Sequence, residues 1–381
     1  MNNFEIHNPT QIHFGKNVTD KLGETIKLYG KNVLFIYGKG SIKNNGIYNR
    51  VITQLNSINA NIKEYSGIKS NPIIEDVIEA AQIGKTEHID VILAVGGGSV
   101  IDTAKITSLA IANSSDPWAI MKSKSKPEKT LPIITVLTLA ATGSEMNSGA
   151  VIQNHETKEK IGFVSPLIFP KHSFLDPEFT YSVSKEYTAY GIVDLIAHAF
   201  ESYFGKGECS LSDRFVEAIV KEAIEYAPKV LAEPENYDYR ANVMLQATTA
   251  LNGIAIYGKS VGDWGVHDIG HNLSLMFDIP HGATLSIIYP AWLKLVKNTY
   301  SEKIAQLGNR LFGTNTADET IHQLELFFKS INCPIRLSDI NIDIDKKEKI
   351  VEQMINTKVN GYAYELNNEE RKQIVEFAYG N

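Results

Sequence analysis

Three stretches in the first half of the chain carry unbroken apolar runs that end in small-residue or glycine-rich turns. They are KNVLFIYGKGS (31–41), HIDVILAVGGGSVIDTAKITSLA (88–110) and LPIITVLTLAATGSEMN (131–147). The second run continues into a long amphipathic pattern, which predicts a helix directly after the turn. Strands that are apolar throughout and alternate with helices are typical of a parallel sheet covered on both faces. We therefore expect an α/β domain that binds its ligand at the carboxyl ends of its strands.

Beyond LDPEFTYSVSKE (175–186) the pattern of apolar positions becomes helical almost without interruption. Helical periodicity marks AYGIVDLIAHAFESYF, SDRFVEAIVKEAIEYAPKVL, RANVMLQATTALNGIAI, ETIHQLELFFKSI and EERKQIVEFAYG. Strand patterns are scarce in this half. An Asp-Pro pair and a Ser-containing turn interrupt the pattern between the two halves. The sequence therefore predicts an α/β domain over residues 1–180 and an all-helical domain over residues 181–381.

Composition narrows the class of protein further. A chain of 381 residues exceeds one ordinary core, and 43% hydrophobic with 21% charged residues is typical of a globular protein. A net charge of −7 offers no basic surface to nucleic acid or anionic lipid. Cys209 and Cys333 form no CxxC pair, which favours a reducing compartment. Because no apolar run resembles a signal peptide or a membrane span, we expect a cytoplasmic protein without membrane contact.

The GGGS turn offers a binding site for a phosphate group. Gly96, Gly97, Gly98 and Ser99 lie between a predicted strand and a predicted helix. Glycines let the backbone approach a ligand, and the helix directs free N–H groups and its positive dipole end toward it. The alternative is a tight turn in which Ser99 caps the helix. The GxGxxG dinucleotide fingerprint is absent.

Two further turns fit parts of a dinucleotide. Gly38, Lys39, Gly40 and Ser41 could close around its adenosine end. A carboxylate there would hold the ribose 2′-hydroxyl of NAD(H), and its absence favours NADP(H); alternatively, Lys39 faces water.

The third run ends in LAATGSEMN (139–147), which we call the third turn; its ATGSEMN part supplies polar groups for ribose or phosphate contacts. These are the hydroxyls of Thr142 and Ser144 and the amide of Asn147. A helix cap followed by a loop explains the same residues.

Five residues of the second half form a candidate metal site. Asp194 and His198 lie four apart on a helix that is apolar nearly all round, so both face one way and are buried. A purely structural Asp–His pair is the alternative. His267 and His271 repeat the spacing, and His281 follows after a short loop. One carboxylate and three imidazoles suit a divalent ion such as Zn²⁺ or Fe²⁺. The five candidates exceed what a tetrahedral site needs, and spacing alone does not say which is left out.

Together these segments resemble the iron-containing, metal-dependent (type III) alcohol dehydrogenases, and within them the NADPH-dependent butanol dehydrogenases and aldehyde reductases. The resemblance covers nearly the whole chain. Its most specific parts are GGGSVIDTAK, TLAATGSEMN, the Asp194/His198 helix and GDWGVHDIGHNLS…PHG.

The resemblance implies an N-terminal Rossmann-like domain followed by a helical domain, as in dehydroquinate synthase-like proteins. It implies that Asp194, His198, His267 and His281 hold the metal, while His271 lies beside the nicotinamide and the substrate as a catalytic residue. It also implies a set of cofactor-binding residues. Gly96 to Ser99 hold the diphosphate, Gly38 and Ser41 border the adenosine ribose, Thr138, Thr142, Asn147 and Lys160 line the cofactor, and Asn71 and Asp102 lie nearby. For Asp102, a carboxylate in the first turn of a helix is a structural alternative. The family usually forms homodimers through its N-terminal strand segment.

Two features depart from the family pattern. Ala140 replaces a usual proline in the third turn, and Gly270 and Asn272 replace usual acidic residues beside His271. The second departure bears on the polarity of the substrate pocket and on the orientation of His271.

The expected function is oxidoreduction of a small-molecule substrate, between butanol-like primary alcohols and their aldehydes, with NADP(H) and one divalent ion (Fe²⁺, Zn²⁺ or Mn²⁺). The metal polarises the substrate oxygen, and His271 relays the proton. The alternatives are a glycerol dehydrogenase, a dehydroquinate synthase-like lyase, or a dinucleotide sensor without turnover. A lyase would need several basic residues around its substrate, and only Lys259 and Lys294 lie near the metal histidines in the sequence.

Overall fold

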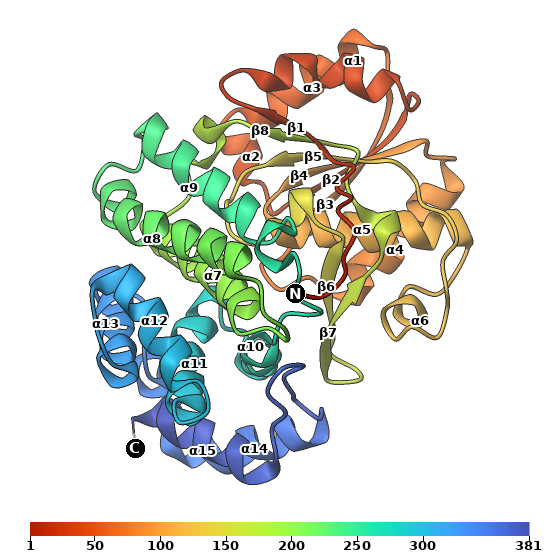
Figure 1. Cartoon of the computed structure of the whole chain (residues 1–381). Coiled ribbons are helices and arrows are strands. Elements are labelled where there is room, and N and C mark those ends of the chain that lie inside the picture. Colours follow the sequence, from red (N-terminus) through yellow and green to blue (C-terminus); the bar gives the residue numbers. More distant parts are fainter. Residues whose placement is uncertain (381) are drawn as a thin grey trace. The chain divides into compact units, whose positions relative to one another are not determined.

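The computed structural model describes residues 1–380 (Figure 1), which divide into two compact units. The α/β unit comprises His7–Val183 and Glu235–Thr248. The helical unit comprises Met1–Ile6, Ser184–Pro234 and the residues from Thr249 onward. The predicted division into two domains at 180/181 stays a prediction.

The α/β unit is built on a parallel sheet, as predicted. Its six strands follow the order β1-β8-β5-β4-β2-β3. They are β1 (Gln11–Phe14), β2 (Asn32–Gly38), β3 (Asn61–Ile68), β4 (Val91–Gly96), β5 (Ile133–Leu137) and β8 (His172–Leu175). Because β2, β4 and β5 are adjacent and parallel, Gly38, Gly96 and Leu137 end their strands at one edge of the sheet.

Helices cover both faces of this sheet, which explains why its central strands are apolar throughout. Phe35 belongs to the same apolar cluster as Val51 and Leu55 of α3, whereas its neighbour Leu34 packs in a cluster with Ile101 and Ala104 of α5. The helices of the unit are α1 (Leu22–Lys27), α2 (Ser41–Asn44), α3 (Ile47–Ser57), α4 (Ile74–Thr86), α5 (Gly98–Asn113) and α6 (Pro117–Met121).

Two parts of the α/β unit differ from the sequence expectation. An antiparallel hairpin, β6 (Gly149–Asn154) and β7 (Glu159–Val164), follows the third turn. Most of α9 (Tyr237–Ala250) also groups with this unit, although its periodicity indicated only a helix of the second half. Met244 joins an apolar cluster with Leu137 and Leu175, and the Thr248 hydroxyl donates to the buried Glu145 carboxyl at 2.5 Å. These long-range contacts decide which unit the segment joins.

The second unit is helical, as predicted. It contains α7 (Lys185–Tyr203), α8 (Ser210–Ala232), α10 (Gly265–Phe277), α11 (His281–Val296), α12 (Ser301–Phe312), α13 (Ala317–Ser330), α14 (Lys347–Asn356) and α15 (Asn368–Tyr379). Helix α7 packs against α8 and α11, and α11 also packs against α10 and α15. Fully buried aromatic side chains fill the space between them, among them Phe200, Phe204, Tyr289 and Trp292. No helix within residues 1–380 is both long and apolar enough to cross a membrane.

Candidate functional site

The buried face of α7 carries the first two metal candidates. Asp194 and His198 lie one helical turn apart, and 3.7 Å separates Asp194 Oδ1 from His198 Nδ1. Both residues are more than nine-tenths buried, because α7 is surrounded by apolar neighbours. A carboxylate is buried here only at a cost that a partner of opposite charge must offset.

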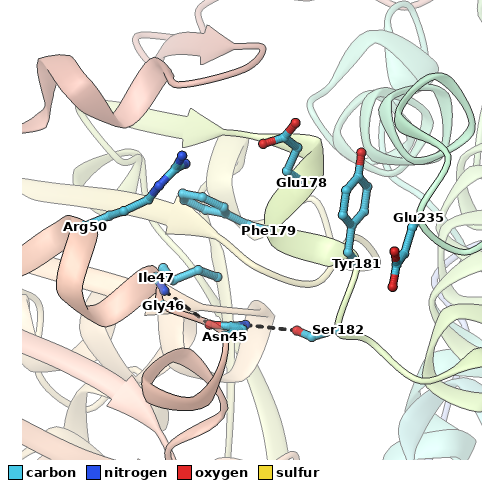
Figure 2. A pocket seen from close by; sticks show the side chains of 9 residues that line it. All are labelled: Asn45, Gly46, Ile47, Arg50, Glu178, Phe179, Tyr181, Ser182 and Glu235. Atoms are coloured by element: carbon cyan, nitrogen blue, oxygen red, sulfur yellow. Dashed lines mark hydrogen bonds between the residues drawn. The ribbon is translucent and has the colours of Figure 1, made fainter.

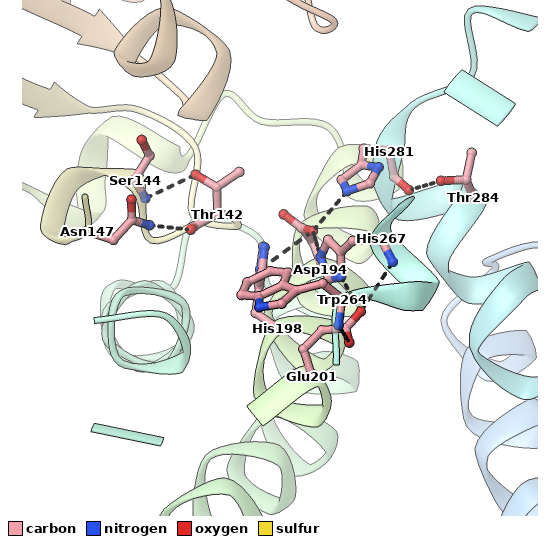
Figure 3. A network of polar contacts seen from close by, with 10 residues as sticks. All are labelled: Thr142, Ser144, Asn147, Asp194, His198, Glu201, Trp264, His267, His281 and Thr284. Carbon is pink, nitrogen blue, oxygen red and sulfur yellow. Dashed lines mark hydrogen bonds and ion pairs between the residues drawn. The ribbon is translucent and has the colours of Figure 1, made fainter. Parts of the chain in front are cut away.

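Helices α10 and α11 bring two more histidines to the same carboxylate (Figure 3). His267 Nε2 lies 3.8 Å from Asp194 Oδ1, and His281 Nε2, on the first residue of α11, lies 4.0 Å from it. Asp194, His267 and His281 each offer one ligand atom, a carboxylate oxygen or a ring nitrogen, and these three atoms lie within 4.8 Å of one another. His198 lies outside this set of three, although the centroids of its ring and the His267 ring are 4.5 Å apart.

The chemistry of these residues fits a divalent cation. Across residues 1–380, His198 Nδ1 and His267 Nε2 are buried atoms that make no hydrogen bond, which is costly unless another partner is supplied. Burial lowers the pKa of His198 to about 4, which keeps its imidazole neutral. Burial also disfavours charge on His267, but the carboxylates of Asp194 and Glu201 outweigh it and raise the pKa of His267 to about 9. The site therefore attracts positive charge and offers imidazole nitrogens to it.

Glu201 is a member of this network that the sequence analysis missed. Its Oε1 lies 2.7 Å from His267 Nδ1, and its side chain is 1% exposed. Asp194, His198 and Glu201 are spaced i, i+4 and i+7, so they share one helix face. This spacing could have predicted that Glu201 lies near the site. It could not have predicted that His267, which is distant in sequence, is the partner of Glu201.

His271 lies beside the metal candidates, and its catalytic role stays a prediction. Its ring centroid is 5.0 Å from that of His281 and 6.4 Å from that of His267. The departures beside it have packing explanations. A Cβ on Gly270 would lie 2.8 Å from Thr284 Oγ1, so glycine permits the close approach of α11. Asn272 is buried and accepts the Thr357 hydroxyl at 2.9 Å.

In the α/β unit, the GGGS turn joins β4 to α5. Gly97 is the N-cap residue, and no side chain caps the first turn of α5. A Cβ on Gly98 would meet Thr142 Oγ1 at 2.4 Å, so the glycine is needed for the close packing of the third turn. The alternative interpretation, in which Ser99 caps the helix, is wrong, because its hydroxyl donates to the Ser70 carbonyl at 2.5 Å instead. The uncapped helix end remains available to an anion.

The turn after β2 has the conformation that its glycines allow. Gly40 adopts φ +127° and precedes Ser41, the first residue of α2. Gly38 ends β2, and Lys39 is exposed. This exposure leaves the Lys39 ammonium group accessible to solvent and to a phosphate group.

The third turn is held by a buried lysine that the sequence analysis did not single out. Lys105 Nζ donates to Asn147 Oδ1 and to the Asn147 carbonyl, both at 3.0 Å, to the Gly149 carbonyl at 2.7 Å and to Ser144 Oγ at 2.8 Å. Burial lowers the pKa of Lys105 to about 8, against the opposing charges of Asp102 and Glu145. Asn147 also donates to the Thr142 carbonyl at 3.3 Å.

Asp102, another predicted cofactor residue, has partners within the protein. Asp102 accepts from Ser144 Oγ at 2.6 Å and from the Val151 N–H at 2.9 Å. These bonds support the structural interpretation of Asp102, which links α5 to the third turn and to the hairpin.

The remaining predicted residues lie close to the same turns. Lys160, on β7, donates to Asn71 Oδ1 at 2.9 Å, and both residues are buried. The Thr138 N–H donates to the Gly96 carbonyl at 3.1 Å, which joins the ends of β5 and β4. Their contacts with a cofactor stay predictions.

A pocket of about 450 Å³ lies elsewhere in the α/β unit (Figure 2), and none of the predicted cofactor residues lines it. Its wall includes the start of α3 at Ile47, the guanidinium-bearing Arg50 and the aromatic Tyr181. Asn45 donates to Ser182 Oγ across one side at 2.9 Å. No local sequence pattern predicts this pocket, because its lining comes from segments far apart in the chain.

Comparison with known proteins gives a consistent result over the whole chain. Residues 9–177 match the family model described as iron-containing alcohol dehydrogenase, and residues 188–379 match that of the C-terminal part of the same family. The chain is 42% identical to the probable NADH-dependent butanol dehydrogenase 1 of Bacillus subtilis, with 97% of this chain and 98% of the relative covered. It is 38% identical to the NADPH-dependent aldehyde reductase YqhD of Escherichia coli, with 90% of each covered.

A solved structure agrees with this result. The crystal structure of NADH-dependent butanol dehydrogenase A from Thermotoga maritima superposes with a TM-score of 0.96 at 37% identity, covering 100% of this chain and 99% of that one. The resemblance inferred from the motifs is confirmed. The chain belongs to the iron-containing alcohol dehydrogenase family.

Proposed function

We propose that this enzyme interconverts butanol-like primary alcohols and their aldehydes, with NADP(H) as hydride carrier and one Fe²⁺, Zn²⁺ or Mn²⁺ ion. The observation that carries the proposal is the buried carboxylate of Asp194 with His198, His267 and His281 around it. Relatives named as butanol dehydrogenases and as an aldehyde reductase support the substrate class.

Asp194, His198, His267 and His281 would hold the ion, and the turns of the α/β unit would hold the dinucleotide. When bound, the ion supplies Lewis-acid chemistry at the oxygen of the alcohol or aldehyde, and the nicotinamide supplies the hydride. His271 carries the proton between this oxygen and solvent, a role that suits a half-buried imidazole beside His281.

The uncapped first turn of α5 would hold the diphosphate of the dinucleotide, and the Gly38–Ser41 turn would border its adenosine ribose. The preference for NADP(H) rests on this turn, which contains Lys39 and no carboxylate. Because relatives from Bacillus subtilis and Clostridium acetobutylicum are named as NADH-dependent, the test below measures both cofactors.

One alternative loses support from the contacts of two lysines. Lys259 is buried and donates to Asp213 at 2.5 Å and to two backbone carbonyls, and Lys294 pairs with Glu325 at 2.7 Å. A lyase that recognises a phosphate and a carboxylate needs basic groups that are not already engaged.

The proposal includes a homodimer in the cytoplasm. β1 lies at one edge of the sheet, and within residues 1–380 no strand pairs with its outer side, to which the same strand of a second copy could add. Cys209 and Cys333 are free thiols, as a reducing compartment favours. Light scattering on the purified full chain would give the mass of a dimer; the mass of a single chain would remove that part.

The test follows oxidation of NADPH and of NADH separately with butanal, in protein loaded with Fe²⁺ or Zn²⁺ and in the His267→Ala variant. The expected result is metal-dependent activity with NADPH that is lost in the variant. Lys39→Asp is expected to shift use toward NADH, because the new carboxylate repels a 2′-phosphate. A preference of the parent for NADH would overturn the cofactor choice alone. No reduction with either cofactor despite bound metal would favour a lyase or a sensor.

A further inference from the structure

Glu201 is a buried carboxylate in the helical unit that the proposed chemistry does not use. Its Oε1 lies 2.7 Å from His267 Nδ1 and 3.2 Å from the His267 N–H, and its Oε2 accepts the Trp264 N–H at 2.5 Å. Figure 3 shows it on the side of the His267 ring opposite Asp194. All these contacts bring hydrogen-bond donors to a group that only accepts when ionised.

We propose that Glu201 is a positioning residue for the metal centre, which fixes the tautomer and the orientation of the His267 ring. An imidazole has two nitrogens, and the hydrogen bond made by one decides the state of the other. Because Glu201 accepts at Nδ1, that nitrogen keeps its hydrogen, and Nε2, 3.8 Å from Asp194 Oδ1, is the nitrogen left to give up its hydrogen and bind a cation. The inference rests on the proposed metal centre and extends it to a residue that is not itself a ligand.

A simpler role, capping the first turn of α10, would use only part of this geometry. The bonds from the N–H groups of Trp264 and His267 satisfy donors at the start of α10, which contributes to stability. The contact with the ring is different, because it bears on the nitrogen that faces the other ligands. The two roles are separable if metal affinity and stability are measured on the same variants.

Glu201→Gln is the informative substitution. A glutamine amide has one oxygen and one NH₂ group. If the amide oxygen faces His267 Nδ1, the NH₂ group faces the Trp264 N–H, and two donors then oppose each other. If the amide is reversed, the NH₂ group donates to Nδ1, so that the hydrogen of the neutral ring lies on Nε2. Either arrangement weakens the presentation of Nε2. We expect the affinity for Zn²⁺ to fall by about 10- to 100-fold, measured on the full chain by competition with a chelator.

Asp268→Asn serves as the matched control. Asp268 follows His267 on the same turn of α10 and is half-buried. Its carboxylate accepts the Asn360 N–H at 3.0 Å. This substitution perturbs the start of α10 without touching the histidine ring. Its Zn²⁺ affinity is expected to stay within about twofold of the parent, whatever its unfolding temperature.

A measurement on the parent protein covers the case in which Glu201→Gln does not fold. In the Zn²⁺-loaded parent, nitrogen-15 NMR of the histidine rings is expected to show hydrogen on His267 Nδ1. An unprotonated Nδ1 would overturn the positioning role, as would a folded Glu201→Gln that binds Zn²⁺ like the parent. If the parent itself binds no Zn²⁺, the proposed metal centre fails as well. If it binds Zn²⁺ but reduces no aldehyde, only the proposed activity fails.

Discussion

Lys105 donates to both the backbone carbonyl and the side-chain oxygen of Asn147, each at 3.0 Å. One buried ammonium group therefore sets the position of the main chain and of the amide of a predicted cofactor residue. Lys105→Met removes these bonds and takes the positive charge of Lys105 away from the buried Asp102 carboxylate. We expect a loss of about 3–5 kcal/mol in the free energy of unfolding, measured with urea, and weaker NADPH binding by fluorescence titration.

The exposed Lys85→Met on α4 is the control for this prediction, with an expected change within about 0.5 kcal/mol. A Lys105→Met protein as stable as the parent would show that the contacts of the ammonium group make no net contribution to the free energy of unfolding.

The same lysine predicts a pH dependence of stability. Burial lowers the pKa of Lys105 to about 8 in the folded chain, below the ordinary value of 10.5. Between these values the unfolded chain binds more protons, so this group makes the free energy of unfolding rise as pH increases. The deficit of Lys105→Met relative to the parent is therefore expected to grow from pH 8 to pH 10. Urea unfolding of both proteins at several pH values checks this; a deficit that shrinks over this range contradicts it.

Gly98 is predicted to tolerate no side chain. A Cβ there would meet Thr142 Oγ1 at 2.4 Å and Thr142 Cγ2 at 2.6 Å, so the third turn must move. Gly98→Ala is expected to cost about 1–3 kcal/mol of stability and to weaken NADPH binding. Gly38→Ala, whose Cβ would find its nearest neighbour at 3.6 Å, is the steric control for thermal unfolding. Equal stability of the two variants would contradict the packing argument.

The four-residue ligand set predicts different metal contents for two histidine variants. His281→Ala removes a proposed ligand and should lose most bound Zn²⁺, whereas His271→Ala should retain it, because His271 is predicted to act on the proton. Metal analysis after gel filtration distinguishes them. Loss of Zn²⁺ from His271→Ala would move His271 into the ligand set.

In the parent protein, removal of the ion by a chelator should lower the free energy of unfolding by about 2.7 kcal/mol if the ion was present at 100 times its Kd.

The helical spacing of Asp194 and His198 predicted one face of the site, because that information is local to a helix. The partner of Glu201 could not be predicted in this way, since His267 reaches it only when α10 packs against α7. Ser99 shows a similar limit. A serine after glycines resembles a helix cap, but a carbonyl from another loop, that of Ser70, competes for its hydroxyl.

The sheet was predictable where strands are buried on both faces and therefore apolar throughout. β1 and β8 are short, and β3 carries polar residues such as Lys63 and Glu64 on its half-exposed surface, so their patterns were weak. The place of α9 was set by contacts of Met244 and Thr248 that no local pattern encodes.

The sheet order β1-β8-β5-β4-β2-β3 and the grouping of residues 235–248 with the α/β unit have a consequence during synthesis on the ribosome. β1 is synthesised early but pairs with β8, so this pairing cannot be complete until Leu175 has left the ribosome. The hydrogen bond from Thr248 to Glu145 forms later still, because residues 184–234 of the other unit are synthesised before Thr248. A fragment that stops at residue 180 therefore has all six strands but leaves an apolar cluster without Met244, and we do not expect the nascent α/β unit to reach full stability until the ribosome has passed residue 248.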